Sequence, residues 1–345
     1  MTPRIGLTLG DPSGIGPELW IKTLLSLRDT PDQLAQLTMF GDPQVLRFAA
    51  QNMGLESAWR TLADSIHIEA VSNLSPSEIE PGKPSQKSGI SQISYLHAAI
   101  AAAQRGDISG LCTGPIHKAS AKAAGFAFPG HTELLAQALG DPTRSVVMML
   151  AGPTLRVALC TIHIALSQVP SALTAAGISA TIKTTALALC EDFGETKPAL
   201  SVVGLNPHAG EAGHFGDEEA RLIVPAMEQT RLDPDFVSCG ATIVGPLVPD
   251  VAFRDAVHPR KGQPRPAALV AMYHDQGLIP LKLLDFDEAV NVTLGLQIVR
   301  TSPDHGTAHD IAGKGIARPD SLQAAIKMCL SHTAQRRKKP RLALS

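Results

Sequence analysis

Short apolar runs alternate along the chain with longer segments of helical periodicity. The runs are short and bounded by turn residues, which is typical of buried β-strands. They are Ile5–Leu9, Leu37–Phe40, Ile108–Cys112, Val146–Leu150, Leu155–Thr161, Leu200–Gly204 and Ala268–Met272. The segments between them predict helices at Pro17–Leu27, Gln44–Gln51, Ser91–Arg105, Thr132–Leu139, Ala172–Phe193 and Asp217–Gln229. This alternation predicts an α/β fold with a mostly parallel, helix-covered sheet.

The length of the chain suits two α/β lobes. Its 345 residues exceed one domain of about 100–200 residues, and no clean linker divides it. Apolar residues make up 44% and charged residues 18% of the chain, which provides a large core and excludes global disorder. We therefore expect two lobes that share sheet strands.

Charge and cysteine content exclude several classes of protein. The formal net charge of −2 lacks the basic excess of nucleic-acid-binding proteins, and the basic cluster Arg336–Lys339 with Arg341 is interpreted as a solvated tail. The five cysteines include no CxxC pair, so no disulfide framework is predicted. No signal peptide is visible, and the richest apolar run, Val146–Ala151, is too short to span a membrane. We expect a soluble, cytoplasmic protein with no nucleic-acid or membrane partner.

A glycine-rich segment, GDPSGIGPE at residues 10–18, joins the first predicted strand to the first helix. Close backbone approach at the glycines and free N–H groups at a helix start suit an anion or a cofactor. A GxGxxG dinucleotide motif would require glycine at Leu19, so the segment is not a Rossmann fingerprint. A tight structural turn explains it almost as well.

Three histidines follow predicted strands. His163, His208 and His274 lie where open α/β sheets build their sites, at the carboxyl ends of strands. Imidazoles from separate strands, with one position left open, suit a catalytic divalent metal. Their spacing matches no local metal motif, and hydrogen-bonded loop histidines are the alternative.

Other polar residues are candidates for binding an anion. His131 and Thr132 open a predicted helix, although a helix capped by Thr132 with an incidental histidine is the favoured interpretation. Lys282, Asn291 and Arg300 recur at nine-residue intervals among apolar strand residues. A buried cation needs a partner, which a ligand phosphate or carboxylate would provide. A solvated edge strand is the alternative.

The ordered motifs indicate a family. GDPSGIGPE, TGPIHK, PGHTELLA, NPHAGE, GPLVPD, MYHDQG and VNVTLGLQIVRTSPDHGTA run nearly end to end, and the chain resembles the 4-hydroxythreonine-4-phosphate dehydrogenase family of vitamin B6 synthesis. The resemblance implies oxidation and decarboxylation of 4-phosphooxy-L-threonine to 3-amino-2-oxopropyl phosphate. The sequence departs from the family mainly in a longer stretch before His274, which includes the Arg254–Pro266 loop, expected to be exposed.

The resemblance also implies the roles of individual residues. It places one divalent ion, zinc, magnesium or cobalt, on His163, His208 and His274. It makes Asp250 and Asp275 the carboxylates of the catalytic site. The substrate contacts that it implies are His131, Thr132, Lys282, Asn291 and Arg300.

A second similarity concerns the cofactor. Residues 304–319, DHGTAHDIAGKGIARP, look like the adenosine-binding loop of isopropylmalate and isocitrate dehydrogenases. The pair Asp310 and Ile311 implies NAD, because a carboxylate binds ribose hydroxyls and repels a 2′-phosphate. Lys314 and Arg318 leave NADP as an alternative, and a turn capped by Asp310 is another. The implied cofactor residues are Gly306, Thr307, Ala308, Asp310 and Ile311.

The same similarity implies two intertwined α/β/α lobes of the isocitrate and isopropylmalate dehydrogenase type, not a classical Rossmann fold. We expect a cofactor lobe at 1–130 with 301–345, and a lobe for metal, substrate and dimer contacts at 131–300, with a cleft between them. A homodimer with a site shared between subunits is implied. The rivals are a homologous dehydrogenase for a four-carbon sugar-acid phosphate or an aromatic cis-dihydrodiol, and a phosphate acyltransferase without NAD.

Overall fold

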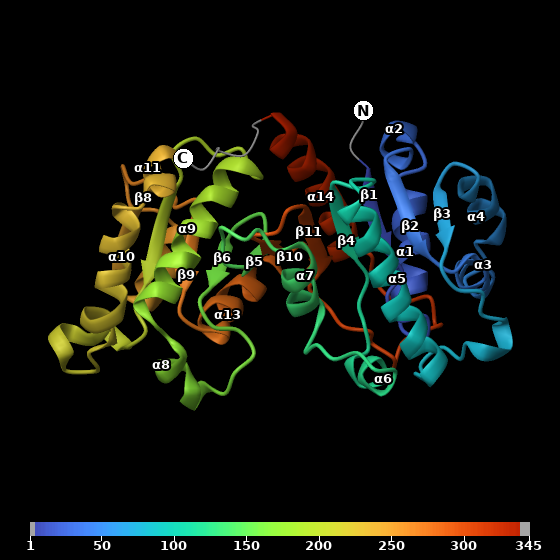
Figure 1. Ribbon diagram of the computed structural model, residues 1–345, viewed down its shortest axis with the longest axis horizontal. Helices are drawn as coiled ribbons and strands as arrows, with labels where there is room; N and C mark the ends of the chain where they lie inside the picture. Colours follow the sequence, from blue (N-terminus) through green and yellow to red (C-terminus); the bar gives the residue numbers. More distant parts are fainter. Residues whose placement is uncertain (1–3, 339–345) are drawn as a thin grey trace. The chain divides into compact units, whose positions relative to one another are not determined.

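The computed structural model describes residues 4–338, which form two compact units (Figure 1). Unit 1 contains the chain up to Leu139 together with Gln297–Thr333. Unit 2 contains Gly140–Leu296 together with the residues from Ala334 onward. Each unit has its own sheet strands and covering helices.

The structure moves the expected boundary near the C-terminus. Sequence analysis assigned 301–345 as a whole to the lobe of residues 1–130 and gave 131–300 to the other, whereas the last described residues belong to unit 2. Among these last residues, Arg336 donates to both carboxylate oxygens of Asp192 in unit 2, at 2.5 and 2.6 Å. The functional role of each lobe stays a prediction.

The interpretation of the basic cluster as a solvated tail is wrong for Arg336, whereas Arg337 and Lys338 are exposed. Helix α14 runs from Asp320 to Lys338 and therefore includes Arg336. The Arg336 side chain is mostly buried and ion-paired, because its guanidinium matches a carboxylate with two parallel hydrogen bonds. Lys339 and Arg341 lie outside the described residues.

Unit 1 is built on a parallel sheet with the strand order β3-β2-β1-β4-β11. The strands β1, β2, β4 and β11 are buried along their whole length, as expected for a sheet covered on both faces. The strands are β1 (Ile5–Thr8), β2 (Leu37–Gly41), β3 (His67–Ala70), β4 (Gly110–Thr113) and β11 (Val299–Pro303).

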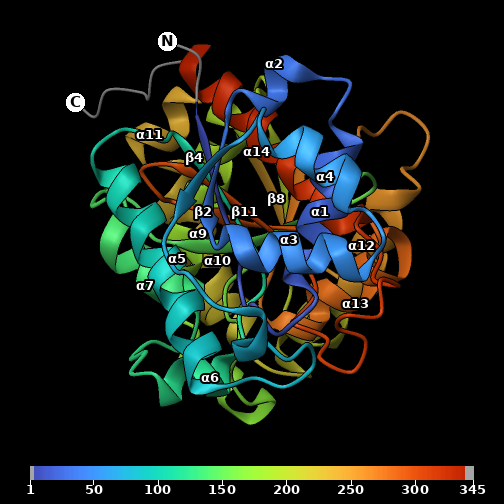
Figure 2. The same cartoon turned by 90° about the vertical axis from the view of Figure 1, so that its right-hand side faces the viewer.

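Helices cover both faces of the unit 1 sheet, and Figure 2 shows α1 and α5 on opposite sides of it. Right-handed crossovers in opposite directions along the sheet explain this placement. The helices are α1 (Gly16–Ser26), α2 (Pro31–Leu34), α3 (Pro43–Asn52), α4 (Glu56–Ala63), η1 (Pro76–Glu78), α5 (Gln86–Gln104), α6 (Lys118–Ala123), α7 (His131–Leu139) and most of α14.

Unit 2 has a mixed sheet with the order β10-β5-β6-β9-β7-β8. Strand β5 is antiparallel to both neighbours, and β6, β9, β7 and β8 are parallel to one another. The strands are β5 (Val147–Ala151), β6 (Arg156–Leu159), β7 (Ala199–Val203), β8 (Thr242–Leu247), β9 (Ala268–Ala271) and β10 (Val290–Leu294).

The helices of unit 2 include two irregular ones that matter for the site. The segment η3 contains left-handed residues, and η4 is a π-helix. The full set is η2 (Leu166–Gln168), α8 (Val169–Ala172), α9 (Ala175–Glu191), η3 (Pro207–Gly213), η4 (Glu219–Ile223), α10 (Val224–Arg231), α11 (Pro234–Ser238), α12 (Pro249–Val257) and α13 (His274–Asp285).

The seven predicted strands are all present, and β3, β8, β10 and β11 are additional. Strand β3 has mainly exposed residues, so it carries no apolar signal. The helix expected from Ala172 begins at Ala175, because the Thr174 side chain accepts the Gly177 N–H and caps it there. The expected exposed loop at Arg254–Pro266 begins only after α12 ends at Val257, and its residues are mostly exposed.

Within residues 4–338, no single helix is both long and apolar enough to cross a membrane. One pair of helices joined by a bend, Leu166–Ala172 with Ala175–Glu191, has the length and apolar composition of a membrane span, by these two criteria alone. The second helix of that pair is largely buried in unit 2. All five cysteines are free thiols.

Candidate active site

Two of the predicted metal ligands lie at the carboxyl ends of neighbouring parallel strands in unit 2. Strands β6 and β9 are paired, and past their ends Thr161 donates from its N–H and its hydroxyl to the Met272 carbonyl, at 3.1 and 2.8 Å. His163 and His274 follow these residues, and their ring centroids are 5.7 Å apart. The structure therefore brings these two histidines together.

A carboxylate orients His274. Its Nδ1 lies 2.7 Å from an Asp275 carboxylate oxygen. An Nδ1–H bonded to a carboxylate leaves Nε2 with its lone pair, which is the arrangement of a metal-binding histidine. The side chains of His274 and Asp275 are 35% and 70% exposed, so both are accessible to a ligand.

The third histidine lies on a strained turn after β7. His208 has a φ of 54°, and residues 209–212 also have positive φ. A left-handed conformation costs about 1–2 kcal/mol for each non-glycine residue, so surrounding contacts must hold it. The Oε1 atom of Glu219 supplies them by accepting the N–H groups of Leu205 and Asn206, both at 2.8 Å. Sequence analysis missed Glu219.

Gln276 is a second residue that sequence analysis missed. Its Oε1 accepts the Met272 N–H, and its Nε2 donates to the Gly204 carbonyl, both at 2.7 Å. Gln276 thus connects the ends of β9 and β7, the strands that lead to His274 and His208. The MYHDQG segment at residues 272–277 contains Gln276 and could have identified it from the sequence.

The full three-histidine set is not gathered. Among residues 4–338, no group of three His, Cys, Asp or Glu side chains stands close enough to hold an ion. The ring of His208 packs beside Phe215, with centroids 5.8 Å apart. The chemistry of the donors nevertheless fits a divalent cation, because His163 and His274 are adjacent and His274 has carboxylate support. The metal site stays a prediction.

Three further predicted residues lie on other elements of unit 2. Asp250 is exposed in the first turn of α12, which packs against η3 and β7. Lys282 lies on α13, eight residues after His274. Asn291 lies in β10, and its Oδ1 is buried with no hydrogen-bond partner among the described residues. A buried acceptor without a partner is a candidate ligand contact.

Unit 1 brings a buried arginine and a histidine together. Arg300 in β11 is 3% exposed and donates to the Thr113 hydroxyl at 2.7 Å. Burial lowers the pKa of Arg300 to about 10, so the guanidinium is still charged at pH 7. Burial, with smaller effects of Arg300 and Lys118, lowers the pKa of His131 to about 3. This imidazole is neutral at pH 7, and its buried Nε2 has no partner among the described residues.

Lys118 adds a second cation that sequence analysis missed. It begins α6, and its Cε would lie 3.8 Å from a Cβ built on Gly130. The TGPIHK segment at residues 113–118 ends at Lys118 and could have identified it from the sequence. Helix α7 begins at His131, so Thr132 lies inside the first turn and not at the capping position favoured from sequence. Lys118, Arg300 and the leading N–H groups of α7 supply positive charge that suits a phosphate or a carboxylate. The Glu133 carboxylate lies in the same group, with Oε2 3.4 Å from a Cβ built on Gly130.

The GDPSGIGPE segment holds the predicted cofactor loop in unit 1. The buried Asp11 places a carboxylate oxygen 2.9 Å from His309 Nε2. The Ile15 N–H donates to the Thr307 carbonyl at 2.9 Å. A Cβ on Gly14 would lie 2.9 Å from both Cβ and O of Thr307, so only glycine allows this approach. The segment is a structural partner of the loop.

Helix α1 holds the far end of the same loop. Glu18 accepts the Gly315 N–H at 2.9 Å, and burial raises the pKa of this carboxyl. Lys22 donates to the carbonyls of Gly315 and Ala317 at 2.8 and 2.6 Å. Residues from the two ends of unit 1 thus fix the segment 304–319.

The loop leaves Asp310 available to a ligand. Its carboxylate is exposed and makes no hydrogen bond or ion pair with any residue from 4 to 338. Backbone hydrogen bonds close the turn, from Ile311 N–H to the Ala308 carbonyl at 3.1 Å and from Lys314 N–H to the Ile311 carbonyl at 3.2 Å. No contact supports the alternative that Asp310 caps the turn.

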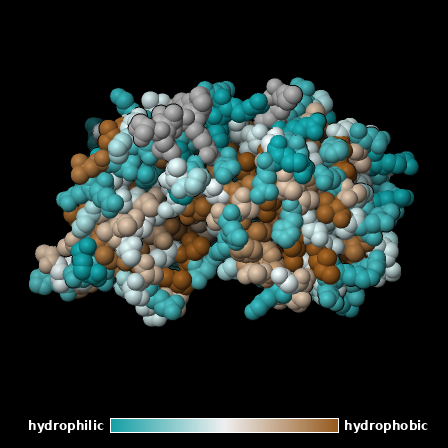
Figure 3. Space-filling model, in the orientation of Figure 1, coloured by the Kyte–Doolittle hydropathy of each residue, from teal (hydrophilic) through white to brown (hydrophobic). Residues whose placement is uncertain are grey.

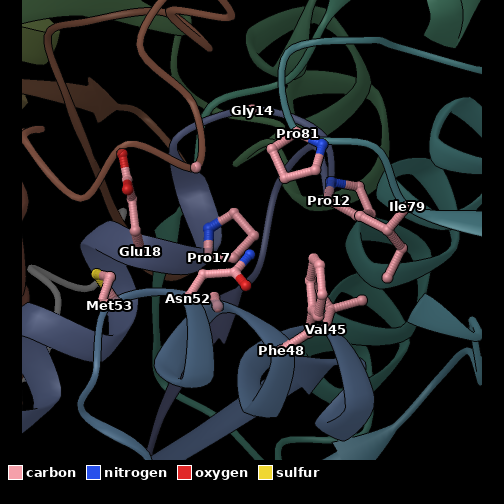
Figure 4. A pocket seen from close by; sticks show the side chains of 12 residues that line it. Pro12, Gly14, Pro17, Glu18, Val45, Phe48, Asn52, Met53, Ile79 and Pro81 are labelled. Carbon is pink, nitrogen blue, oxygen red and sulfur yellow. The ribbon is translucent and has the colours of Figure 1, made fainter. Parts of the chain in front are cut away.

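A cavity beside this loop is a packing gap. Its volume is about 20 Å³, roughly the space that one water needs. Figure 4 shows Val45 and Phe48 of α3 facing Pro12 and Pro17, with Glu18 at the opposite side. The cavity is too small for an adenine ring.

Comparison with known proteins decides the family. The model of the family described as pyridoxal phosphate biosynthetic protein PdxA matches residues 33–329. The chain belongs to this family. A 4-hydroxythreonine-4-phosphate dehydrogenase of Desulfosudis oleivorans is 44% identical over 353 residues, which cover 98% of each chain. The crystal structure of a 4-hydroxythreonine-4-phosphate dehydrogenase from Klebsiella pneumoniae matches with a TM-score of 0.80 and 35% identity, over 97% of this chain and 99% of that one.

A solved structure of another activity is also similar. The terephthalate 1,2-cis-dihydrodiol dehydrogenase from Burkholderia xenovorans has a TM-score of 0.64 and 26% identity, over 96% of this chain and 98% of that one. The comparisons confirm the resemblance and the α/β fold class predicted from sequence. PdxA family membership makes the chain an oxidoreductase of pyridoxal phosphate biosynthesis.

Proposed function

We propose that this PdxA family protein oxidises the C3 hydroxyl of 4-phosphooxy-L-threonine with NAD and releases CO2, which leaves 3-amino-2-oxopropyl phosphate. Relatives named 4-hydroxythreonine-4-phosphate dehydrogenase match the chain nearly end to end. The observation that carries the proposal is the pair of His163 and His274 at the ends of β6 and β9, with His274 oriented by Asp275.

The reaction needs a hydride acceptor and a base. In the first step, hydrogen leaves C3 with its electron pair for the nicotinamide ring, and the hydroxyl proton goes to a base. In the second, the bond from C2 to the carboxyl carbon breaks, CO2 leaves and C2 takes up a proton. Asp275 is engaged with His274 and positions that imidazole, so we assign the proton acceptor to Asp250, whose carboxylate is exposed.

We assign one divalent cation to His163, His208 and His274. Bound there, it supplies a Lewis acid for the substrate hydroxyl and for the carbonyl that replaces it. Glu219 and Gln276 keep the strand ends of this set in place. Whether the ion is zinc, magnesium or cobalt is a question for metal analysis of the purified protein.

We assign the anionic groups of the substrate to polar residues that the fold places among apolar neighbours. Arg300 and Lys118 provide positive charge, and the neutral His131 and Asn291 each hold a buried polar atom without a partner among the described residues. A phosphate would satisfy such groups through charge-assisted hydrogen bonds. The other proposed substrate contacts are Thr132 and Lys282.

We assign the cofactor to residues 306–311 of the loop that Asp11 and Glu18 hold. The exposed Asp310 accepts hydrogen bonds from ribose hydroxyls, whereas a 2′-phosphate there would repel it. NAD is therefore the expected cofactor, with Lys314 and Arg318 as the groups that favour NADP. Steady-state kinetics with both cofactors test this: kcat/KM is higher for NAD, and Asp310→Ala narrows the difference. A kcat/KM for NADP equal to or above that for NAD contradicts the assignment.

We further propose a cytoplasmic homodimer that associates through unit 2. The exposed surface of unit 2 includes Ile279, Leu283 and Leu284 of α13 and Phe286 just after it, and the exposures of Leu283 and Phe286 are 80% and 66%. Figure 3 shows hydrophobic surface over the part of the chain where Figure 1 labels α13. Apolar surface of this kind is typical of a subunit interface. Five free thiols fit a reducing compartment. Sedimentation tests the dimer, and Leu283→Asp is expected to dissociate it.

Turnover of a substrate panel tests the main proposal. The purified protein is assayed with NAD and divalent ions against 4-phosphooxy-L-threonine, a four-carbon sugar-acid phosphate and an aromatic cis-dihydrodiol, and products are identified by mass spectrometry. We expect NADH, CO2 and 3-amino-2-oxopropyl phosphate from the first substrate. The likeness to the Burkholderia xenovorans enzyme makes a cis-dihydrodiol the second candidate. Preferred turnover of the dihydrodiol replaces the proposal with that alternative.

A further inference from the structure

A second, larger cavity lies in unit 2, away from the histidines. Its volume is about 420 Å³, within the range of about 300–1,000 Å³ typical of small-molecule sites. Its lining comes mainly from residues 152–156, 195–199 and 264–269, around the amino-terminal ends of β6, β7 and β9. His163 and His274 follow the carboxyl ends of β6 and β9. A four-residue strand is roughly 10–13 Å long, so the cavity is separate from the predicted metal ligands.

The charges that line this cavity favour an anion. They are three cations, Arg156, Lys197 and Arg265, and one carboxylate, Glu195, which leaves an excess of two positive charges. Arg156 is already paired with Glu195 at 2.6 Å. Lys197 and Arg265 have no carboxylate partner in residues 4–338, and Arg265 donates to the Val257 carbonyl at 2.7 Å. Two cations are thus available to a ligand.

The backbone restrains both of these cations. Lys197 has a φ of 55°, a left-handed conformation that a non-glycine residue keeps only when neighbours fix it. The strand β7 begins two residues later, and Ala199 accepts the Ala267 N–H at 2.7 Å. Arg265 stands between Pro264 and Pro266, which limit its backbone to extended conformations. A restrained backbone reduces the conformational entropy that this segment loses when it binds a ligand.

We propose that this cavity is an anion-binding site for a small dianion, either a phosphate monoester or a dicarboxylate. The planar guanidinium of Arg265 donates two parallel hydrogen bonds to such a group, and Lys197 adds a point charge. The Arg156–Glu195 pair forms a fixed wall. Part of the lining comes from Pro264, Arg265 and Pro266 at the end of the Arg254–Pro266 loop. Because the cavity is separate from the predicted metal ligands, this proposal is independent of the proposed catalytic function.

Calorimetric titration of the full-length protein with inorganic phosphate, and separately with succinate, tests this inference. Both titrations use the Arg300→Ala background, because that change weakens the other expected phosphate site. We expect saturable binding of at least one anion. Lys197→Ala and Arg265→Ala should each weaken it about tenfold or more, the loss expected for one charge-assisted hydrogen bond.

Lys261→Ala is the matched control. It removes one positive charge from the same loop, but Lys261 does not line the cavity, so binding should change less than twofold. Binding of phosphate alone identifies a phosphate site, and binding of succinate alone identifies a dicarboxylate site. The inference is overturned if neither anion binds up to 10 mM (roughly −2.7 kcal/mol), or if Lys197→Ala and Arg265→Ala bind as the control does. Since no turnover is measured, the outcome is independent of the proposed reaction.

Discussion

The two units hold their candidate residues in different ways. In unit 1 the loop at 304–319 is held by hydrogen bonds with Asp11, Ile15, Glu18 and Lys22, and the buried Nε2 of His305 is without a hydrogen-bond partner among residues 4–338. In unit 2 the predicted metal-ligand histidines follow three strands, but only two of them are adjacent and the third lies on a left-handed turn. We therefore propose that the loop of unit 1 is ordered before its ligand binds, whereas an ion would complete the set of histidines in unit 2.

The surfaces of the two units also differ in the number of exposed hydrophobic residues. Of the large hydrophobic residues that are exposed between residues 4 and 338, Ile90 and Ile316 belong to unit 1 and the others to unit 2. An apolar surface requires a partner more often than a polar one does. We therefore propose that unit 2 needs a bound ion and a second subunit for its final arrangement, and that unit 1 needs neither.

Removing a histidine of unit 2 should have the largest effect. His163→Ala or His274→Ala should lower turnover by more than about 100-fold, because loss of a residue that only supports a ligand already costs about 10–100-fold. Metal content measured on the purified variants should fall in parallel. His258→Ala, on an exposed part of the same unit, is the control. Full metal content in both active-site variants would refute the assignment.

Replacing Arg300 of unit 1 should have the next largest effect. Arg300→Ala should lower kcat/KM for 4-phosphooxy-L-threonine by about 10–100-fold, since a charge-assisted hydrogen bond contributes about 1.5–3 kcal/mol. Turnover of unphosphorylated 4-hydroxy-L-threonine should be slow in the wild type and should change little in the variant. Arg47→Ala, an exposed arginine of the same unit, should change neither. Equal turnover of the two substrates by the wild type contradicts this role.

Breaking the contact between Asp11 and His309 should weaken cofactor binding without abolishing the chemistry. Asp11→Asn loses one charge-assisted bond of a buried pair, so KM for NAD should rise about 5–30-fold while kcat at saturating NAD changes less than about threefold. Hydrogen exchange at residues 307–315 should become faster. Asp64→Asn, an exposed carboxylate of unit 1, is the control. An unchanged KM for NAD shows that the loop does not need this contact.

The smallest effect is a pH dependence of stability from His131. Its pKa is about 3 in the folded protein and about 6.5 in an unfolded chain, so only the unfolded chain takes up the proton between these values. Stability therefore falls as the pH drops from 6.5 towards 3, by about 1 kcal/mol in the first pH unit. His131→Gln should remove this part of the pH dependence of the unfolding free energy, which is measured by urea unfolding between pH 7 and pH 5. Parallel curves for wild type and variant disprove the effect.

Local sequence patterns are enough to predict most of the strands and one edge of the candidate site. Apolar runs bounded by turn residues identify β1, β2 and β4–β7 with β9, and a histidine after three of these runs marks the edge where His163 and His274 meet. Strand β3 is not predicted because its side chains are mainly exposed, and the left-handed turn at His208 is not predicted because four of its left-handed residues, 208, 209, 211 and 212, are not glycine.

Contacts between distant parts of the chain leave no local pattern. Glu18 and Gly315 are 297 residues apart, and Asp11 and His309 are 298 apart. For this reason the sequence predicts an anion-binding loop or a simple turn at GDPSGIGPE. In the structure this segment instead contacts the loop at 304–319. Glu219 is missed for a related reason, because its role depends on a buried carboxylate that accepts backbone N–H groups.

The central claim is that unit 1 binds the cofactor in an arrangement that does not require the ion of unit 2. The most direct measurement is a fluorescence titration of the protein with NADH, before and after removal of metal by a chelator. The account predicts that the metal-free protein binds NADH with a Kd within about threefold of the metal-loaded value, a difference under about 0.7 kcal/mol. Loss of NADH binding on removal of the metal, restored by adding the ion back, would contradict it.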